Sequence, residues 1–377
     1  MTSHVVSSKG WKWGLRLSAL VVVIWCLDAA IYYIFHDGRD DIRGLFVAEN
    51  SRGYALKPGF RGVVTDGYAF NVATNSRGYR GAEWRLNEKF RVLMAGNSFV
   101  FGLPLPAKDG IVGKMRAQVS ADVGIYNVGV PSYGVLQSLE TIRRECPVIK
   151  PRHVVYAMDF NDFRRDHMDL RSRTVVDGYK LSTWSDDRLK RLPTPLSKAE
   201  VNRQKARLNA ETSWSLRQSL QLRSIRMFLA QRYLHPRQIA ERLLPDSILG
   251  AGYRQRYVFT TRSEFGFPDV LKEATAAIRD MATAAHACGA SFTLVVFPNA
   301  SEAYYQLTEP ATETVLTPLL ASTMDILDLR KRAARGENLA RPRSGYYHAR
   351  TTHWAATEIT RHLAKRYPVA LKMRTDG

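Results

Sequence analysis

Four short apolar runs constrain this chain of 377 residues more than any other feature. Each run ends close to a small or polar residue, and segments with helical periodicity (residues 135–146 and 270–288) lie between them. Strands that are apolar throughout and alternate with helices are typical of a parallel sheet covered by helices on both faces. The sequence therefore predicts an α/β fold with a doubly wound parallel sheet, whose strands include residues 91–96, 125–130, 153–160 and 291–297.

Small polar residues follow the predicted strands at the point where each strand ends. They are Ser98, Ser132, Asn161 and Asn299. In open parallel sheets, ligands bind at the carboxyl ends of the strands. We therefore expect these four side chains to lie along one edge of the sheet and to mark a site there.

Ser98 is the candidate nucleophile, because it follows a strand and precedes a helical stretch. A serine hydroxyl attacks a carbonyl only when a base takes its proton, and the developing negative charge needs hydrogen-bond donors. His353 is the candidate base, with His348 and His362 as the other histidines nearby, and the Asn161 amide is a candidate donor. The alternative role for Ser98 is a helix N-cap, which is common for serine.

Four blocks of sequence, in order, resemble those of the SGNH/GDSL hydrolase family. The family's Gly-Asp-Ser-Phe-x-Phe-Gly block is similar to residues 96–102 (GNSFVFG), and its Asn-x-Gly-x-Pro-Gly-Tyr-Gly-like turn is similar to residues 127–134 (NVGVPSYG). The third block ends in Asn-Asp, as residues 161–162 do, and the last contains a His-Trp pair, as residues 353–354 do. The segment NSRGYRG (residues 75–81) also resembles the stretch that leads into the first block in cell-envelope members.

The resemblance implies a flavodoxin-like SGNH hydrolase fold and a role for each matching residue. Ser98 would be the nucleophile and His353 the base, and the oxyanion hole would consist of the Asn161 side chain and the backbone N–H groups of Ser98 and Ser132. The implied activity is that of an esterase or O-acyltransferase acting on acyl groups, expected to be acetyl, of a cell-envelope polysaccharide. No metal and no cofactor is expected.

Three positions depart from the family pattern. Asn97 replaces an Asp, and Ser132 replaces a Gly in a turn that favours positive φ. The Asp expected two or three residues before His353 is absent, a loss that lowers kcat by about 10⁴-fold in a triad. Asp159 shares a strand face with Asn161, so its carboxylate is a candidate substitute; the alternative is an ordinary hydrogen-bonded loop carboxylate.

The missing acid leaves a second function open, from a different class. A catalytically impaired relative of the family would bind anionic glycan or lipid at a membrane surface rather than cleave an ester. Labelling of Ser98 by a serine-reactive probe distinguishes the two functions.

Residues 17–35 form an apolar run interrupted by a single charge, Asp28. A helix of this length spans about 28 Å, close to the roughly 30 Å hydrocarbon core of a bilayer. Basic residues precede the run and acidic residues follow it, which favours a cytoplasmic N-terminus. The run therefore predicts a single-pass transmembrane anchor with the main domain periplasmic or otherwise extracytoplasmic. A cleaved signal peptide and a soluble core helix are the alternatives.

The chain is strongly basic, since Lys and Arg (55) exceed Asp and Glu (35) by 20. About half of the excess lies within residues 164–245, where residues 197–244 have helical periodicity. We expect residues 164–265 to form a basic, largely helical insertion over the strand ends or toward a membrane, or else a solvated helical pair on the sheet. The charge favours an anionic partner, such as acidic lipid or polysaccharide, unless it is evenly spread for solubility. A nucleic-acid partner is not expected, because no nucleic-acid motif accompanies the charge.

The chain has three cysteines, and no CxxC pair occurs among them, so a zinc or redox motif is not expected. Cys146 and Cys288 are either a disulfide, if the body lies outside the cytosol, or two buried free thiols, which is the favoured interpretation. The predicted organisation is a cytoplasmic tail (1–16), the transmembrane anchor (17–35), an extended N-terminal arm (36–89), the first part of the hydrolase domain (90–163), the insertion (164–265) and the second part of the domain (266–372).

Overall fold

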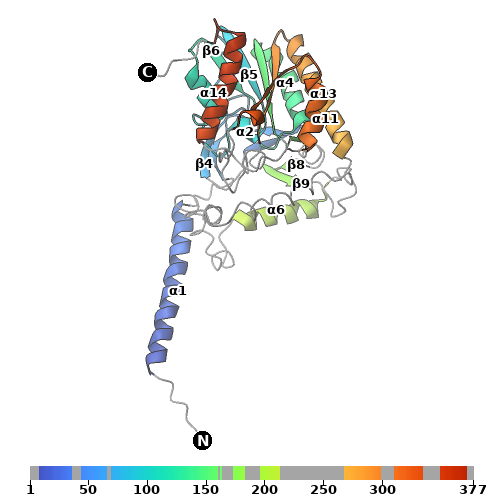
Figure 1. The fold of residues 1–377 in the computed structure, drawn as a ribbon. Helices are drawn as coiled ribbons and strands as arrows, with labels where there is room; N and C mark the ends of the chain where they lie inside the picture. Colours follow the sequence, from blue (N-terminus) through green and yellow to red (C-terminus); the bar gives the residue numbers. More distant parts are fainter. Residues whose placement is uncertain are drawn as a thin grey trace.

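The centre of the molecule is a five-stranded parallel sheet (Figure 1). The computed structural model describes residues 8–35, 44–65, 69–159, 162–163, 173–182, 196–212, 267–298, 310–333 and 349–371. The strand order β11-β10-β7-β5-β6 is the flavodoxin-like order 2-1-3-4-5, counted along the chain within this sheet. Its strands are β5 (Phe90–Gly96), β6 (Val123–Asn127), β7 (His153–Met158), β10 (Ser291–Val296) and β11 (Asp325–Asp328).

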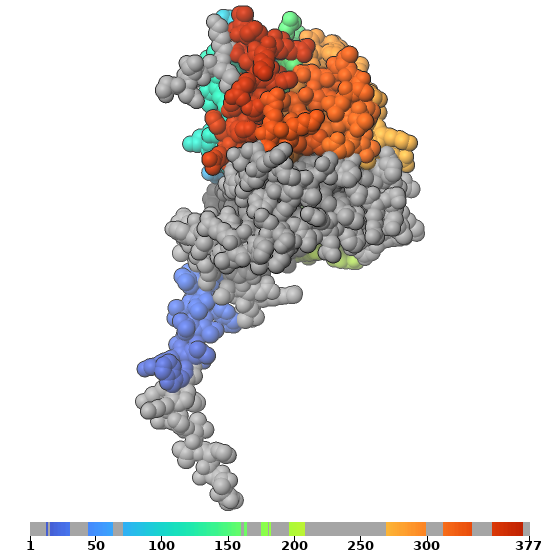
Figure 2. Space-filling view, viewed as in Figure 1, coloured from blue at the N-terminus to red at the C-terminus, as the bar shows by residue number. Residues whose placement is uncertain are grey.

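Helices cover both faces of this sheet, which confirms the predicted doubly wound α/β fold. Every residue of β6 and β7 is buried, because side chains on both faces of these strands pack against helices. One face packs against α4, α11 and α13, and the other against α3 and α14. Both α13 and α14 reach the surface of the body (Figure 2). The helices are α3 (Ile111–Gln118), α4 (Val135–Ile149), α11 (Phe267–Ala287), α13 (Pro310–Leu320) and α14 (Ala349–Arg366).

Two antiparallel strand pairs lie in the N-terminal arm. A turn at residues 75–78 follows them, with Gly78 at φ +82° and the Asn75 side-chain oxygen accepting hydrogen bonds from the N–H groups of Arg77 (3.1 Å) and Tyr79 (2.9 Å). Buried residues of the arm join the same core cluster as α4. The strands are β1 (Phe46–Glu49), β2 (Gly53–Leu56), β3 (Arg61–Thr65) and β4 (Ala69–Ala73).

The described part of the insertion consists of a hairpin and one helix. The helix α6 (Lys198–Thr212) begins where the helical periodicity does, but the hairpin of β8 (Arg173–Val176) and β9 (Tyr179–Ser182) was not expected in a largely helical segment. The N–H of Gly44 donates to the Gly178 carbonyl in the hairpin turn (3.3 Å), so the hairpin contacts the arm. Figure 1 places these elements on the side of the sheet where its strands end.

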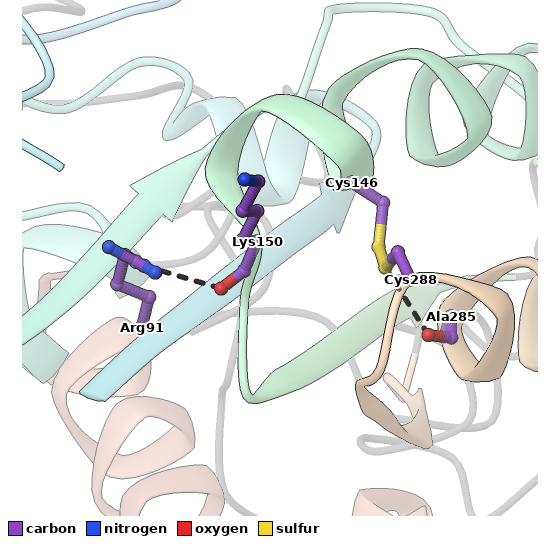
Figure 3. The surroundings of a disulfide bond; sticks show 5 residues. All are labelled: Arg91, Cys146, Lys150, Ala285 and Cys288. Atoms are coloured by element: carbon purple, nitrogen blue, oxygen red, sulfur yellow. Dashed lines mark hydrogen bonds between the residues drawn. A yellow bond between two sulfur atoms is a disulfide. The ribbon is translucent and has the colours of Figure 1, made fainter. Parts of the chain in front are cut away.

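Cys146 and Cys288 form a disulfide, with their Cα atoms 6.1 Å apart, so the interpretation as two free thiols is wrong. Cys146 lies near the end of α4 and Cys288 just after α11, and these two helices pack side by side on one face of the sheet (Figure 3). The packing of these two helices brings the sulfur atoms together, and the spacing of the cysteines in the sequence does not predict this proximity. The Arg91 side chain on β5 fastens the end of α4 by donating to the Lys150 carbonyl (3.3 Å).

The helix α1 (Ser8–Phe35) precedes the arm. Leu17, Val22 and Leu27 are among its side chains that are more than half exposed. Within the described parts of the chain, no helix combines the length and the apolar character needed to cross a membrane. The transmembrane anchor over residues 17–35 therefore stays a prediction of the sequence.

Candidate active site

The strand register brings three of the predicted site residues to one place. Gly96 of β5 pairs with Ala157 of β7, and the Gly96 carbonyl accepts a hydrogen bond from the N–H of Val130 (3.1 Å). Ser98, Asp159 and Ser132 each lie two residues beyond one of these positions. They therefore meet at the carboxyl edge of the sheet, where β5 lies next to β7. The strand order reverses at this point, which is where ligands bind in folds of this type.

Gly96 makes the sharp turn from β5 into the helix α2 (Ser98–Phe101) possible. Its φ is +152°, and a Cβ atom there would lie 2.5 Å from the Ala157 carbonyl oxygen and 2.7 Å from Cγ2 of Val100. A larger residue would push α2 away from β7, so the glycine keeps Ser98 close to the sheet.

Ser98 is 1% exposed, and its hydroxyl has no hydrogen-bond partner among the described residues. The N-cap of α2 is instead Asn97, whose side-chain oxygen accepts from the N–H of Phe99 (2.9 Å). The N-cap interpretation of Ser98 is therefore wrong. The hydroxyls of Ser138, Thr312 and Thr360 are also buried without a partner among the described residues, so it is the position of Ser98 at the strand edge, together with this property, that suits a catalytic role.

Ser132 has a positive φ of +65°, as the sequence predicts for this turn. Since only glycine adopts this conformation without strain, the surrounding contacts must hold the turn. Among the described residues, none accepts a hydrogen bond from the backbone N–H of Ser132 or of Ser98. Two such N–H groups at one strand edge can stabilise an oxyanion. Asn161, the third predicted donor, and Asn299 lie outside the described residues.

Two buried carboxylates favour Asn over Asp at position 97. The Asn97 amide donates one hydrogen bond to Asp159 (3.0 Å) and another to Asp162 (2.6 Å), and the hydroxyl of Tyr156 donates to the second oxygen of Asp162 (3.0 Å). All four side chains are buried. An Asp at position 97 would put a third carboxylate against two others, whereas the amide supplies a donor to each.

Asp159 is thus a buried, hydrogen-bonded carboxylate, and it lies two residues after Ala157, the strand partner of Gly96. This contact agrees with the loop-carboxylate alternative, and it also keeps the carboxylate beside Asn97, the residue that precedes Ser98. Its predicted role as the missing acid is not tested by this geometry and stays a prediction.

His353 lies within α14, four residues after Ala349. Thr351 and Thr352 are buried and belong to the packed face of α14, although β-branched residues lower helix propensity on their own. The His353 side chain is exposed, and no described residue hydrogen-bonds to its ring.

The neighbours of His353 nevertheless connect it to the Ser98 region. The Thr352 hydroxyl donates to the carbonyl of Asp109 (2.6 Å), in the loop between α2 and α3. Trp354 packs against the core cluster that contains Phe99. The start of α14 is therefore held against the segment that carries Ser98.

The bridging role of Asn97 and the Tyr156 hydroxyl were not foreseen from the sequence, nor was the contact of Arg80 with α2. In the sequence, Asn97 is only a departure from a motif and Arg80 only part of the segment at residues 75–81, and neither observation predicts these contacts. No periodicity or spacing marks Tyr156. No group of three or more His, Cys, Asp or Glu side chains suited to a metal ion occurs among the described residues.

Comparisons with known proteins give slight structural likenesses only. No protein-family model matches the chain, and no curated protein matches it. Solved structures similar to it include a putative lipolytic protein of the G-D-S-L family from Desulfitobacterium hafniense (11% identity over 72% of this chain and 99% of the other, TM-score 0.37). Others are a lipase/acylhydrolase from Enterococcus faecalis (11%, 76% and 99%, TM-score 0.37) and a carbohydrate acetylesterase family member from Sinorhizobium meliloti (9%, 74% and 100%, TM-score 0.34). With TM-scores this low, function has to be inferred from the geometry of this chain.

Proposed function

We propose that the protein is a serine esterase or O-acyltransferase with Ser98 as its nucleophile. One observation carries the proposal: the Ser98 hydroxyl is buried without a partner among the described residues, at the point where strand order reverses. Beside it, the turn of Ser132 contributes a backbone N–H to which no described residue offers an acceptor. A nucleophile and a donor at one strand edge suit acyl transfer.

In the proposed reaction, the Ser98 oxygen attacks the ester carbonyl while His353 takes the hydroxyl proton. The carbonyl oxygen becomes an oxyanion that the N–H groups of Ser98 and Ser132 and the Asn161 amide stabilise. The C–O bond of the ester then breaks, the leaving alcohol receives the proton from His353, and an acyl group stays on Ser98. Water or a sugar hydroxyl attacks this acyl-enzyme in the same way, which gives hydrolysis or transfer.

The base has no acid just before it in the sequence, and Asp159 is the proposed substitute. Asp159 and Asp162 accept from the same Asn97 amide, but Asp162 also accepts from Tyr156. Asp159→Asn should therefore lower kcat far more than Asp162→Asn, whose main expected effect is on stability. Equal small effects on kcat would exclude Asp159 from the reaction.

The substrate we propose is an acylated, expected to be acetylated, polysaccharide of the cell envelope. The disulfide between Cys146 and Cys288 supports a location outside the cytosol, since structural disulfides persist in oxidising compartments. The membrane anchor at residues 17–35 and a cytoplasmic N-terminus belong to the same proposal. Protease digestion of intact cells tests the location: an extracytoplasmic body is cleaved once the outer barrier is opened, and a protected body contradicts it.

A second candidate function follows from the residues before His353. Arg350 and Thr351 stand where a triad acid is expected. A chain without a working acid would serve as a binder of anionic glycan or lipid, with the basic insertion as its contact surface.

Labelling with a fluorophosphonate probe and hydrolysis of p-nitrophenyl acetate separate the two functions. We expect labelling of the wild type, and Ser98→Ala should abolish it and lower kcat by at least about 10³-fold. Ser138→Ala is the matched control, because the Ser138 hydroxyl on α4 is also buried without a partner among the described residues. A wild type that is not labelled at any pH, or a Ser98→Ala chain labelled equally, would favour the binder.

A further inference from the structure

The N-terminal arm contacts both loops that carry the proposed catalytic groups. Arg80 of the arm lies under α2, which bears Ser98, and Tyr54 of β2 lies against the turn that bears Ser132. We propose that the arm is a positioning element of the active site, in which Arg80 fixes the nucleophile and Tyr54 fixes the oxyanion turn. The inference rests on the proposed function and assigns residues far from Ser98 in the chain to it.

Arg80 donates hydrogen bonds to four backbone carbonyl groups, three of which belong to the end of α2 and the turn that follows it. Its guanidinium donates to the carbonyl oxygens of Phe101 (3.0 Å), Gly102 (2.8 Å), Leu105 (2.6 Å) and, in the arm itself, Asn71 (3.3 Å). Its charged carbon lies 4.8 Å from the centre of the Phe101 ring. The side chain is 4% exposed, so these bonds form away from bulk water.

A helix as short as α2 needs such external support. It has four residues, and a single turn has no cooperative stability of its own. The last carbonyl groups of a helix lack donors within the helix, and a cation at that end interacts favourably with them. Burial lowers the pKa of Arg80 to about 10, which still leaves the guanidinium charged at neutral pH. Arg80 thus supplies the donors that a second helical turn would have supplied.

Tyr54 holds the Ser132 turn from both sides of the serine. Its hydroxyl donates to the carbonyl of Pro131 (3.2 Å), and its own carbonyl accepts from the hydroxyl of Tyr133 (2.5 Å). The two tyrosine rings pack edge to face with their centres 5.3 Å apart, and neither is exposed to solvent. Because Ser132 adopts a positive φ that serine disfavours, these reciprocal bonds are what keeps its N–H aimed in one direction.

The arm is fastened to α4 by a separate set of contacts. Arg77 donates to Glu145 (2.7 Å), and the hydroxyl of Tyr79 donates to the other oxygen of the same carboxylate (3.0 Å). The side-chain amide of Gln137 donates to the carbonyl of Arg52 (2.7 Å). Loss of one of these bonds loosens the arm without directly removing the contacts of Arg80 or Tyr54.

The positioning role predicts a loss of turnover rather than of binding. We expect Arg80→Gln to lower kcat for p-nitrophenyl acetate and the rate of fluorophosphonate labelling by about 100-fold, with KM changed less than about threefold, because a small displacement of a reacting group has effects of this size. Arg80→Lys, which keeps the charge but not the planar fork of donors, should recover part of the loss. Tyr54→Phe, which removes one hydroxyl and keeps the ring, should lower both rates by about 10-fold.

Arg77→Gln is the matched control, since it removes an arginine of the same arm whose partner lies on α4. It should lower Tm while kcat and the labelling rate per folded molecule stay at the wild-type value. The inference is overturned if folded Arg80→Gln and Tyr54→Phe chains keep wild-type kcat and labelling, or if Arg77→Gln reduces kcat as much as they do.

If Arg80→Gln does not fold, Arg80→Lys and Tyr54→Phe decide by the same criteria. A wild type without Ser98-dependent hydrolysis or labelling would overturn the proposed function and this inference together, whereas an active wild type with unimpaired variants would overturn the inference alone.

Discussion

The two edges of the central sheet both bury polar side chains, but they satisfy them differently. At the amino edge, His153 of β7 contacts the Thr293 hydroxyl (2.8 Å), Thr293 donates to Asp325 (2.5 Å), and the ring of His362 lies 3.0 Å from both oxygens of Asp325. At the carboxyl edge, Asn97 is fully engaged, yet the neighbouring Ser98 hydroxyl has no described partner.

This difference separates a structural network from a reactive one. Burial lowers the pKa of His153 to about 3, so the ring is neutral and fits its hydrogen bonds to Thr293 and to Tyr367 (3.2 Å). Burial alone raises the pKa of Asp325, but hydrogen bonds from His362 and Thr293 outweigh it and lower the pKa overall. Polar groups that satisfy one another stabilise the fold, whereas an unsatisfied hydroxyl held in place is available for chemistry.

Loss of the disulfide near the amino edge should have the largest effect on stability. The disulfide closes a loop with a sequence separation of 142, for which the chain-entropy argument gives about 5 kcal/mol and measured losses are typically about 2–5 kcal/mol. Cys288→Ser should therefore lower the free energy of unfolding by about 2–5 kcal/mol, with kcat unchanged at temperatures where the chain is folded. Denaturant unfolding and hydrolysis assays measure the two quantities.

Cys26→Ser is the control for this prediction, since Cys26 is a free, exposed cysteine. It should leave both quantities at the wild-type value. A loss of kcat in folded Cys288→Ser would show that the two edges are coupled and would break the distinction between them.

Asn97→Asp introduces the Asp of the motif that residues 96–102 resemble, and we expect it to lower both the stability and the activity of this protein. It replaces an amide that donates to Asp159 and Asp162 by a third carboxyl group, which should lower the free energy of unfolding at pH 7 by about 1–3 kcal/mol and also lower kcat. The introduced carboxyl group should have a raised pKa in the folded state, so the loss of stability is complete above that folded pKa, shrinks as the pH falls towards the unfolded pKa of about 3.9, and is absent below it.

A second substitution sharpens the test. In the Asn97→Asp background, Asp162→Asn again leaves two carboxyl groups beside one amide, and it should recover part of the lost stability. If the double variant loses at least as much free energy of unfolding as the two single variants together, the repulsion between carboxylates is not the cause.

The smallest effect concerns the pH dependence of stability. His153 has a pKa lowered from 6.5 to about 3 in the folded state, so between these values the unfolded chain binds more protons, and stability falls as the pH falls. This group alone should cost about 2 kcal/mol between pH 7 and pH 5. His153→Gln should remove that part of the pH dependence, as measured by denaturant unfolding at the two pH values.

The charged groups around His153 set the background of this measurement. Burial is the largest cause of its lowered pKa; Arg366 and His362 lower the pKa further, and Asp325 raises it. His286→Gln, at an exposed position at the end of α11, should keep the wild-type pH dependence. An equal change in both variants would assign the effect to histidine content and not to the buried network.

Four of the five strands could be predicted because burial on both faces produces a continuous apolar run. β11 could not, since two of its four residues, Asp325 and Asp328, are acidic, and their partners are known only from the fold. Ser98, Ser132 and Asp159 could be placed together because each follows a strand. Arg80 and the Asn97 bridge could not, because their roles depend on carbonyl and carboxylate groups that only tertiary packing brings near.

The disulfide also has a consequence for the integrity of the chain. Cys146 precedes the whole of residues 164–265 and Cys288 follows it, so β5, β6 and β7 are linked covalently to β10 and β11 twice, once through the backbone and once through sulfur. A proteolytic nick within that stretch would leave one molecule until a reductant is added. The segment can therefore be cut, and in evolution lengthened or exchanged, while the two parts of the sheet stay joined.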